Sequence, residues 1–322
     1  MSATTENINS EPLPNLEPLR TQIADSGYEL TLTDKSIRNV QSCGFRGGNL
    51  NLALVAVNML IDEHPTTLRG WMYRVVSAGW LPSTDNKHYR RIGRIATRLR
   101  EEGVVPFSWL VDGVRSTQKP SSWAGLDDYA DVVAESYRKD FWAGMDDYIH
   151  VIVEKDAMAG VLSPITREYD VALSPIRGYS SLSFAHEIAS TWNKVDKPIY
   201  CYFLGDFDPS GFDLERDIKD KLDRYTTGCE VHWIRLGVNV EDFEEFDLLP
   251  LKTKPGDKRA AAFIQEHGSQ CAELDAIPSS AIRQRLRDAI ESHIPHEEWE
   301  KLKEVERTEK ETFKATLKKL GA

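Results

Sequence analysis

Residues 199–211 read IYCYFLGDFDPSG, and this stretch decides the fold of the second half of the chain. Its six leading, mostly apolar residues predict a buried β-strand, and its Pro and Gly predict a tight turn into a helix over about 211–225. Asp206 and Asp208 are two positions apart, so in an extended segment their side chains point the same way and can reach one cation. Carboxylates of this kind suit Mg²⁺, which takes oxygen ligands and keeps several waters. The alternative is an Asp-rich turn that only caps the following helix.

A second apolar run predicts another carboxylate at the same edge of the sheet. IHVIV, residues 149–153, predicts a strand, and Glu154 follows it directly. Further short strands predicted over 170–173 and 230–236 alternate with helices, which is typical of a parallel α/β sheet covered on both faces. Because the carboxyl ends of parallel strands meet at one edge, we expect Glu154 beside the two Asp, where three acids need a cation. For Glu154 alone the alternative is an acid at a helix N-terminus, and Lys155 is equally consistent with a phosphate contact and a solvated lysine.

Composition bounds the class of protein. The chain has 322 residues, 41% hydrophobic and 28% charged, which predicts a globular protein of about two domains. No apolar run is long enough to span a membrane, and the N-terminus lacks the pattern of a secretory signal. Four scattered cysteines without a C-x-x-C pair argue against a zinc site and for a reducing cytoplasm. A net charge of -11 counts against a simple nucleic-acid coat, but not against an enzyme that confines its basic residues to one groove.

The first half of the chain shows helical periodicity with a basic third helix. We expect a flexible polar arm over 1–35, followed by helices over 50–64 and 67–79. A basic helix over 86–103 and a short strand or hairpin over 104–114 follow them. This order is that of a winged helix, a DNA-binding variant of the helix-turn-helix, which we assign to residues 36–140.

The basic helix is the predicted contact to DNA. Its arginines are spaced to lie against phosphates, and the candidates are Arg90, Arg91, Arg94 and Arg98. The alternative is a solvated helix face. Tyr89 lies among them and is more typical of a contact to the DNA backbone.

Four motifs together resemble one enzyme family. V-E-K-D-A at 153–157 and D-F-D-P-S-G at 206–211 resemble the acidic motifs of a Toprim domain, the metal-binding module of topoisomerases and some nucleases. R-G-Y-S-S at 177–181 resembles a stretch between those motifs in the DNA-cleaving chain of topoisomerase VI and its relatives. In that branch a winged helix with a catalytic tyrosine in an R-x-x-x-Y motif precedes the Toprim domain, and this chain has Arg69-Gly-Trp-Met-Tyr73.

The resemblance implies a division of the chain and a set of ligands. A Toprim domain would span 145–250, and a helical C-terminal extension would span 251–322. Glu154, Asp206 and Asp208 would bind Mg²⁺, and Glu154 would alternatively relay a proton.

The same resemblance implies the reaction and the partners. Tyr73 would attack a phosphodiester of double-stranded DNA to form a tyrosyl-phosphate intermediate, and Arg69 would hold the scissile phosphate. Lys155 would contact DNA near the acids. A homodimer is expected, with Tyr73 of one protomer meeting the acids of the other; a separate ATPase chain is a partner that the sequence does not imply.

The predicted function is therefore Mg²⁺-dependent DNA cleavage and rejoining, of the kind performed by the DNA-cleaving chain of a type IIB topoisomerase. One alternative is a Toprim nuclease that activates water, with Tyr73 structural. The other is a DNA-binding regulator without turnover. We expect a cytoplasmic, nucleoid-associated protein, consistent with a phage or plasmid gene.

Overall fold

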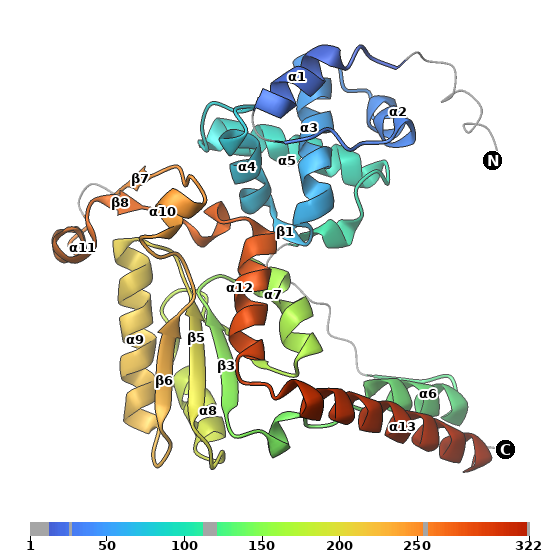
Figure 1. The fold of residues 1–322 in the computed structure, drawn as a ribbon, viewed down its shortest axis with the longest axis vertical. Coiled ribbons are helices and arrows are strands. Elements are labelled where there is room, and N and C mark those ends of the chain that lie inside the picture. The colour runs from blue at the N-terminus through green and yellow to red at the C-terminus, as the bar shows by residue number, and fades with distance from the viewer. Residues whose placement is uncertain (1–12, 26–27, 112–120, 254–256, 321–322) are drawn as a thin grey trace.

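A computed structural model of the chain describes residues 13–25, 28–111, 121–253 and 257–320. It is a mixed α/β protein with parallel sheets, which confirms the predicted fold class at that level. In Figure 1 a helical domain, coloured blue to cyan, lies above an α/β domain, and the orange-red helix α12 stands where the two meet.

The α/β domain is built on one four-stranded parallel sheet. The strand order is β4-β3-β5-β6, with β3 and β5 in the centre. The strands are β3 (Tyr148–Val153), β4 (Ala172–Pro175), β5 (Ile199–Leu204) and β6 (Val231–Arg235). The helices of this domain are α7 (Asp156–Glu168), α8 (Leu182–Trp192) and α9 (Pro209–Tyr225). The four predicted strands and the helix predicted over about 211–225 are thus present, within a few residues of the expected bounds.

Helices cover both faces of this sheet. Ile149, Val151 and Val153 of β3 belong to a core shared with α7 and α12, whereas Ile152 faces a second core with α8 and α9. Alternate residues of a strand point to opposite faces, so a strand that is apolar throughout can bury both of them.

The helical domain contains the three helices predicted from periodicity. Its elements are α2 (Asp34–Ser42), α3 (Gly48–Glu63), β1 (Thr66–Thr67), α4 (Leu68–Ser77), α5 (Asn86–Glu101), the 3₁₀ turn η1 (Phe107–Trp109) and β2 (Leu110–Val111). Of the short strand or hairpin expected over 104–114, the strand is present as β2, but it pairs in parallel with β1 and not with a neighbouring strand of a hairpin. Pro106 lacks an N–H and fixes its φ, which favours the η1 turn over a paired strand. Residues 112–114 of that hairpin lie outside the described residues.

The expected flexible arm over 1–35 is wrong for its second part. Residues 17–25 form helix α1 (Glu17–Asp25), and Leu19 and Ile23 of that helix are buried in the core of the helical domain. Leu19 and Ile23 are four positions apart and share one helical face, and tertiary packing stabilises a helix too short to form alone.

The C-terminal part of the chain is more than a solvated tail. It contains α10 (Asp242–Glu245), β7 (Leu251–Lys252), α11 (Ala260–His267), β8 (Gln270–Cys271), the turn η3 (Leu274–Ala276), α12 (Ser279–Glu291) and α13 (His296–Leu320). Ile282, Leu286 and Ile290 of α12 are fully buried against the sheet. Trp299 in the first turn of α13 is buried, and the helix then packs along α6 (Leu126–Ser136), away from the sheet. The short turn η2 (Trp142–Gly144) precedes β3. Within the described ranges, no helix is both long and apolar enough to cross a membrane.

His150 makes the stability of the sheet depend on pH. The Trp192 indole N–H donates to His150 Nδ1 (3.0 Å), and His150 Nε2 lies 2.9 Å from the Ser174 hydroxyl. Burial lowers the pKa of His150 from its ordinary 6.5 to about 4. Between these values the unfolded chain binds the proton more readily than the folded one, so stability is complete above pH 6.5 and falls as the pH drops toward 4. From pH 7.5 to pH 5.0 we expect His150 to account for a loss of about 2 kcal/mol.

Urea unfolding of the wild-type protein and of His150→Gln at both pH values measures this loss. All other titrating groups cancel in the comparison. Equal losses in the two proteins would contradict the assignment to His150.

Candidate active site

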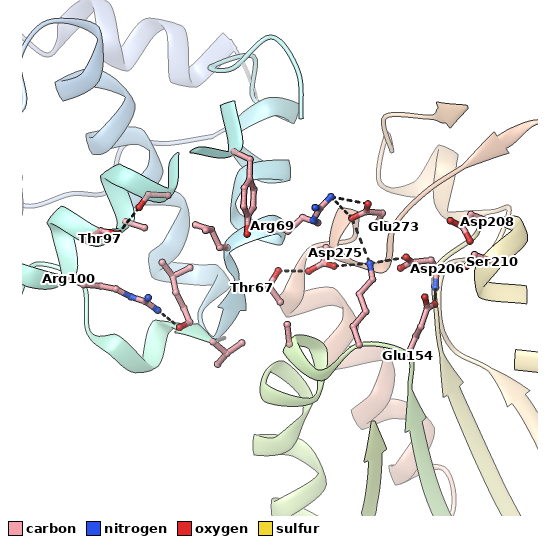
Figure 2. A pocket seen from close by; sticks show the side chains of 18 residues that line it. Thr67, Arg69, Thr97, Arg100, Glu154, Asp206, Asp208, Ser210, Glu273 and Asp275 are labelled. Carbon is pink, nitrogen blue, oxygen red and sulfur yellow. Dashed lines mark hydrogen bonds and ion pairs between the residues drawn. The ribbon is translucent and has the colours of Figure 1, made fainter. Parts of the chain in front are cut away.

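A cleft of about 530 Å³ lies between the helical domain and the carboxyl edge of the sheet. One wall comes from α4 and α5, and the other from the loops after β3 and β5 and from the segment after β8 (Figure 2). The cleft lining carries five carboxylates and three cationic groups: Glu154, Asp206, Asp208, Glu273 and Asp275, with Arg69, Arg100 and Lys155. This excess of negative charge favours a further cation there.

The structure brings the three predicted acids to this cleft. Glu154 follows β3, and Asp206 and Asp208 follow the neighbouring β5, as expected for the ends of parallel strands. The backbone N–H of Asp206 donates to Glu154 Oε2 at 2.8 Å. Asp208 is the N-cap of α9 and accepts a hydrogen bond from the Gly211 N–H at 2.7 Å. Asp208 therefore caps the helix with one oxygen and also lines the cleft. A helix cap and a cation ligand are thus compatible roles for this residue.

Gly211 keeps the two acidic loops together. A Cβ atom at this position would lie 2.4 Å from the Asp206 carbonyl oxygen and 3.2 Å from Glu154 Oε2. Real Cβ atoms do not approach backbone oxygen so closely. The glycine of the D-F-D-P-S-G motif thus permits the contact between the loop after β5 and the carboxylate of Glu154.

Glu273 and Asp275 are site residues that the sequence did not assign. They follow β8, where Phe207 and Ala272 form an antiparallel bridge, and the Leu274 N–H donates to Asp206 Oδ1 at 2.8 Å. The sequence did contain a signal, because two carboxylates spaced as in the D-x-D motif recur at 273–275. Their pairing with a loop nearly seventy residues earlier is a tertiary contact, which periodicity does not reveal.

Lys155 lies at the centre of the acids. Its Nζ is 2.8 Å from Asp206, 3.3 Å from Asp275 and 3.7 Å from Glu273. Burial alone would lower the pKa of this ammonium, but the three carboxylates outweigh burial and raise the pKa above its ordinary value. Lys155 is therefore charged in this site rather than solvated.

Burial changes the acids as well. The pKa of Asp206 is raised to about 7: burial contributes most, Lys155 acts to lower it, and the negative charge of Glu154 acts to raise it. Burial also raises the pKa of Glu154, against the hydrogen bond from the Asp206 N–H. Two neighbouring carboxyls with raised pKa values at one sheet edge are typical of a functional site.

Side chains of α4 and the residues before it join the helical domain to these acids. Arg69 donates to both oxygens of Glu273 at 3.0 and 3.1 Å, and Thr67 donates to Asp275. The Arg69 guanidinium also lies 5.5 Å from the centre of the Tyr89 ring, and Tyr89 lines the cleft. Arg69 thus lies beside the acids of its own chain and binds Glu273, and Tyr89 is a cleft residue.

Tyr73 lies behind the cleft rather than in its lining. Its side chain is only 2% exposed and packs in the core that η3 and α12 share with the sheet. Burial raises the pKa of its hydroxyl, Glu273 raises it further, and Arg69 and Lys155 lower it. As the domains stand, the phenol is not free to meet a phosphate.

The four arginines predicted to bind DNA lie outside the cleft lining. Arg90 and Arg94 are exposed on α5. Arg91 donates to Asn49, and Arg98 pairs with Glu102 at 3.0 Å and donates to the Cys43 carbonyl. The cleft face of α5 is formed instead by Tyr89, Gly93, Ala96, Thr97 and Arg100.

The acids do not form a closed coordination set in this conformation. Among the described residues, no three His, Cys, Asp or Glu side chains converge closely enough to hold a metal ion. Asp206 is directed to Lys155 and to the Leu274 N–H, and Asp208 to the start of α9. Neither a family model nor a curated protein sequence matches the chain, so its function is argued from this geometry.

Proposed function

We propose that the chain cleaves and rejoins DNA with Mg²⁺ through a tyrosyl-phosphate intermediate. The observation that carries the proposal is the meeting of Glu154, Asp206 and Asp208 in one cleft with Arg69 and Lys155. Acids that gather a metal beside cations that attract phosphate are what phosphodiester chemistry requires.

The chemistry of the donor set fits a magnesium ion, and the acids would have to move closer together than in this conformation to hold it. The candidate ligands are carboxylate oxygens, which Mg²⁺ prefers. The cleft lining holds five carboxylates and only three cationic groups. Glu154, Asp206 and Asp208 would hold the ion. When bound, Mg²⁺ would polarise the phosphate and stabilise the charge that develops on its oxygens.

The protein side chains provide the rest of the reaction. Tyr73 attacks the phosphorus and forms the phosphotyrosyl bond as the P–O bond to the deoxyribose breaks, and the proton lost by the tyrosine hydroxyl balances the one gained by the leaving deoxyribose oxygen. Rejoining reverses this exchange without an external energy source. Arg69, one helical turn before Tyr73, holds the scissile phosphate once it releases Glu273.

Tyr73 requires the two domains to separate. Its ring belongs to the core that contains residues of η3 and α12, and α4 packs on η3, so moving the helical domain away from that segment exposes the hydroxyl. In a homodimer resembling the DNA-cleaving chains of topoisomerase VI, Tyr73 of one protomer then meets the acids of its partner, and the two sites cut both strands of double-stranded DNA. The helical domain acts as the winged helix and the α/β domain as the Toprim domain of that arrangement.

Hydrolysis by activated water is the second candidate, favoured by the burial of Tyr73. A nuclease needs the acids and Lys155 but no tyrosine in the cleft. Its products are hydrolysed ends without a covalent adduct.

Incubation with supercoiled plasmid distinguishes the candidates. Purified protein is mixed with plasmid, with Mg²⁺ or with EDTA, and the reaction is stopped with denaturant before protease treatment. We expect Mg²⁺-dependent nicks or breaks whose ends carry protein. Breaks without protein would support the nuclease, and binding with no cleavage would support a regulator without turnover.

A further inference from the structure

Lys155 occupies the position of a cation among the acids of the cleft. Three carboxylates from two separate loops surround its Nζ, and the closest is Asp206 at 2.8 Å. The contacts of Lys155 run from Asp206 to Asp275 and Glu273, the two acids that Figure 2 shows beside Thr67 and Arg69 of the helical domain. Lys155 therefore neutralises the site from within the chain.

Both carboxylate oxygens of Asp206 already have partners. Its Oδ1 accepts the Leu274 N–H at 2.8 Å, and its Oδ2 contacts the Lys155 ammonium. A divalent cation at Asp206 would lie within a few ångströms of that ammonium, and two cations so close in a buried site repel strongly. Metal and ammonium cannot share Asp206 at low cost.

Two other carboxylates lie within reach of the Lys155 ammonium. Asp275 and Glu273 already lie 3.3 and 3.7 Å from its Nζ, on the side of the helical domain. A shift toward them releases Asp206 and leaves the ammonium paired. The same two acids accept hydrogen bonds from Thr67 and Arg69, so the shifted ammonium competes with the hydrogen bonds that join the domains.

We infer that Lys155 is a resident cation that competes with the metal for Asp206 and so sets the metal affinity of the site. The inference rests on the proposed metal site and adds a regulatory element to it. Metal binding moves Lys155 from Asp206 to the Glu273 and Asp275 side, where it faces a phosphate in the cleft. The site thereby exchanges an internal cation for an external one.

Isothermal titration of the full chain with MgCl₂ tests this competition. Lys155→Met and Lys155→Gln remove the charge, Lys155→Arg keeps it, and Asp206→Asn shows which binding belongs to this site. Lys139→Met is the matched control, because Lys139 also pairs with a carboxylate at 3.0 Å and is 29% exposed, against 30% for Lys155. Thermal melting in EDTA checks that each variant folds.

We expect the two neutral variants to bind Mg²⁺ with a Kd lower by about ten-fold or more, since the repulsion is gone. Lys155→Arg and Lys139→Met should keep the wild-type Kd, and Mg²⁺ should raise the melting temperature of Lys155→Met more than that of the wild type. An unchanged or higher Kd in both neutral variants, with binding still lost in Asp206→Asn, would overturn the inference and leave the metal site standing. Absence of Mg²⁺ binding in every variant would overturn the metal site and the inference together.

Discussion

Tyr73→Phe is expected to abolish the covalent protein–DNA adduct and to lower strand cleavage by about 1000-fold or more, since the attacking hydroxyl is gone. The substitution removes one atom from a side chain that packs with its ring. Within the described residues the Tyr73 hydroxyl makes no hydrogen bond, so the free energy of unfolding should change by about 1 kcal/mol or less. The measurement is the adduct trapped by denaturant on labelled DNA, with melting temperature as the check on folding.

Tyr89→Phe is the control for this experiment. Tyr89 lines the cleft beside Arg69, so it is the other tyrosine that geometry could present to a phosphate. We expect Tyr89→Phe to retain the adduct. An adduct lost in Tyr89→Phe and kept in Tyr73→Phe would transfer the nucleophile to Tyr89, and cleavage undiminished in both variants would favour activated water.

The sheet and its acids could be predicted because their signals are local. An apolar run over 199–204 can be buried only in the middle of a sheet with both faces covered, and the polar D-x-D that follows must then lie at the strand end. The same logic applied to 149–154 placed Glu154 beside Asp206. Both placements follow from the parallel topology of the sheet alone. The hydrogen bond from the Asp206 N–H to Glu154 confirms that the two residues are neighbours.

The part of the cleft wall formed by the segment after β8 could not be predicted, because long-range pairing positions it. Glu273 and Asp275 reach the site through the bridge between Phe207 and Ala272. That bridge depends on the close fit of the segment after β8 against the loop after β5, and no periodic pattern marks it. The sequence offered only two acids of ambiguous role.

The sequence left two interpretations of Tyr73 open, a nucleophile and a structural aromatic, for a related reason. The pattern of α4 showed an aromatic on a helix but not which side would be covered, and the cover comes from η3 and α12, two hundred residues later. Arg69 was assigned to phosphate, and in this conformation it binds Glu273. The helix could therefore be predicted, whereas the state of its functional face depends on how the domains dock.

Asp206→Asn is expected to remove Mg²⁺ binding and to reduce cleavage by about 1000-fold or more, which is about 4 kcal/mol of barrier. The amide keeps an oxygen to accept the Leu274 N–H, and Lys155 keeps Asp275 and Glu273, so the fold should persist. Asp242→Asn is the matched control: Asp242 is equally buried, loses the same charge and pairs with Arg285 outside the cleft. Both candidate reactions need Asp206, so this variant tests the shared step, metal-dependent attack on phosphate, independently of the attacking group. If Asp206→Asn still cleaves plasmid with Mg²⁺ at the rate of Asp242→Asn, the carboxyl edge of the sheet is not the reaction centre, and the tyrosine and water mechanisms are both wrong for this cleft.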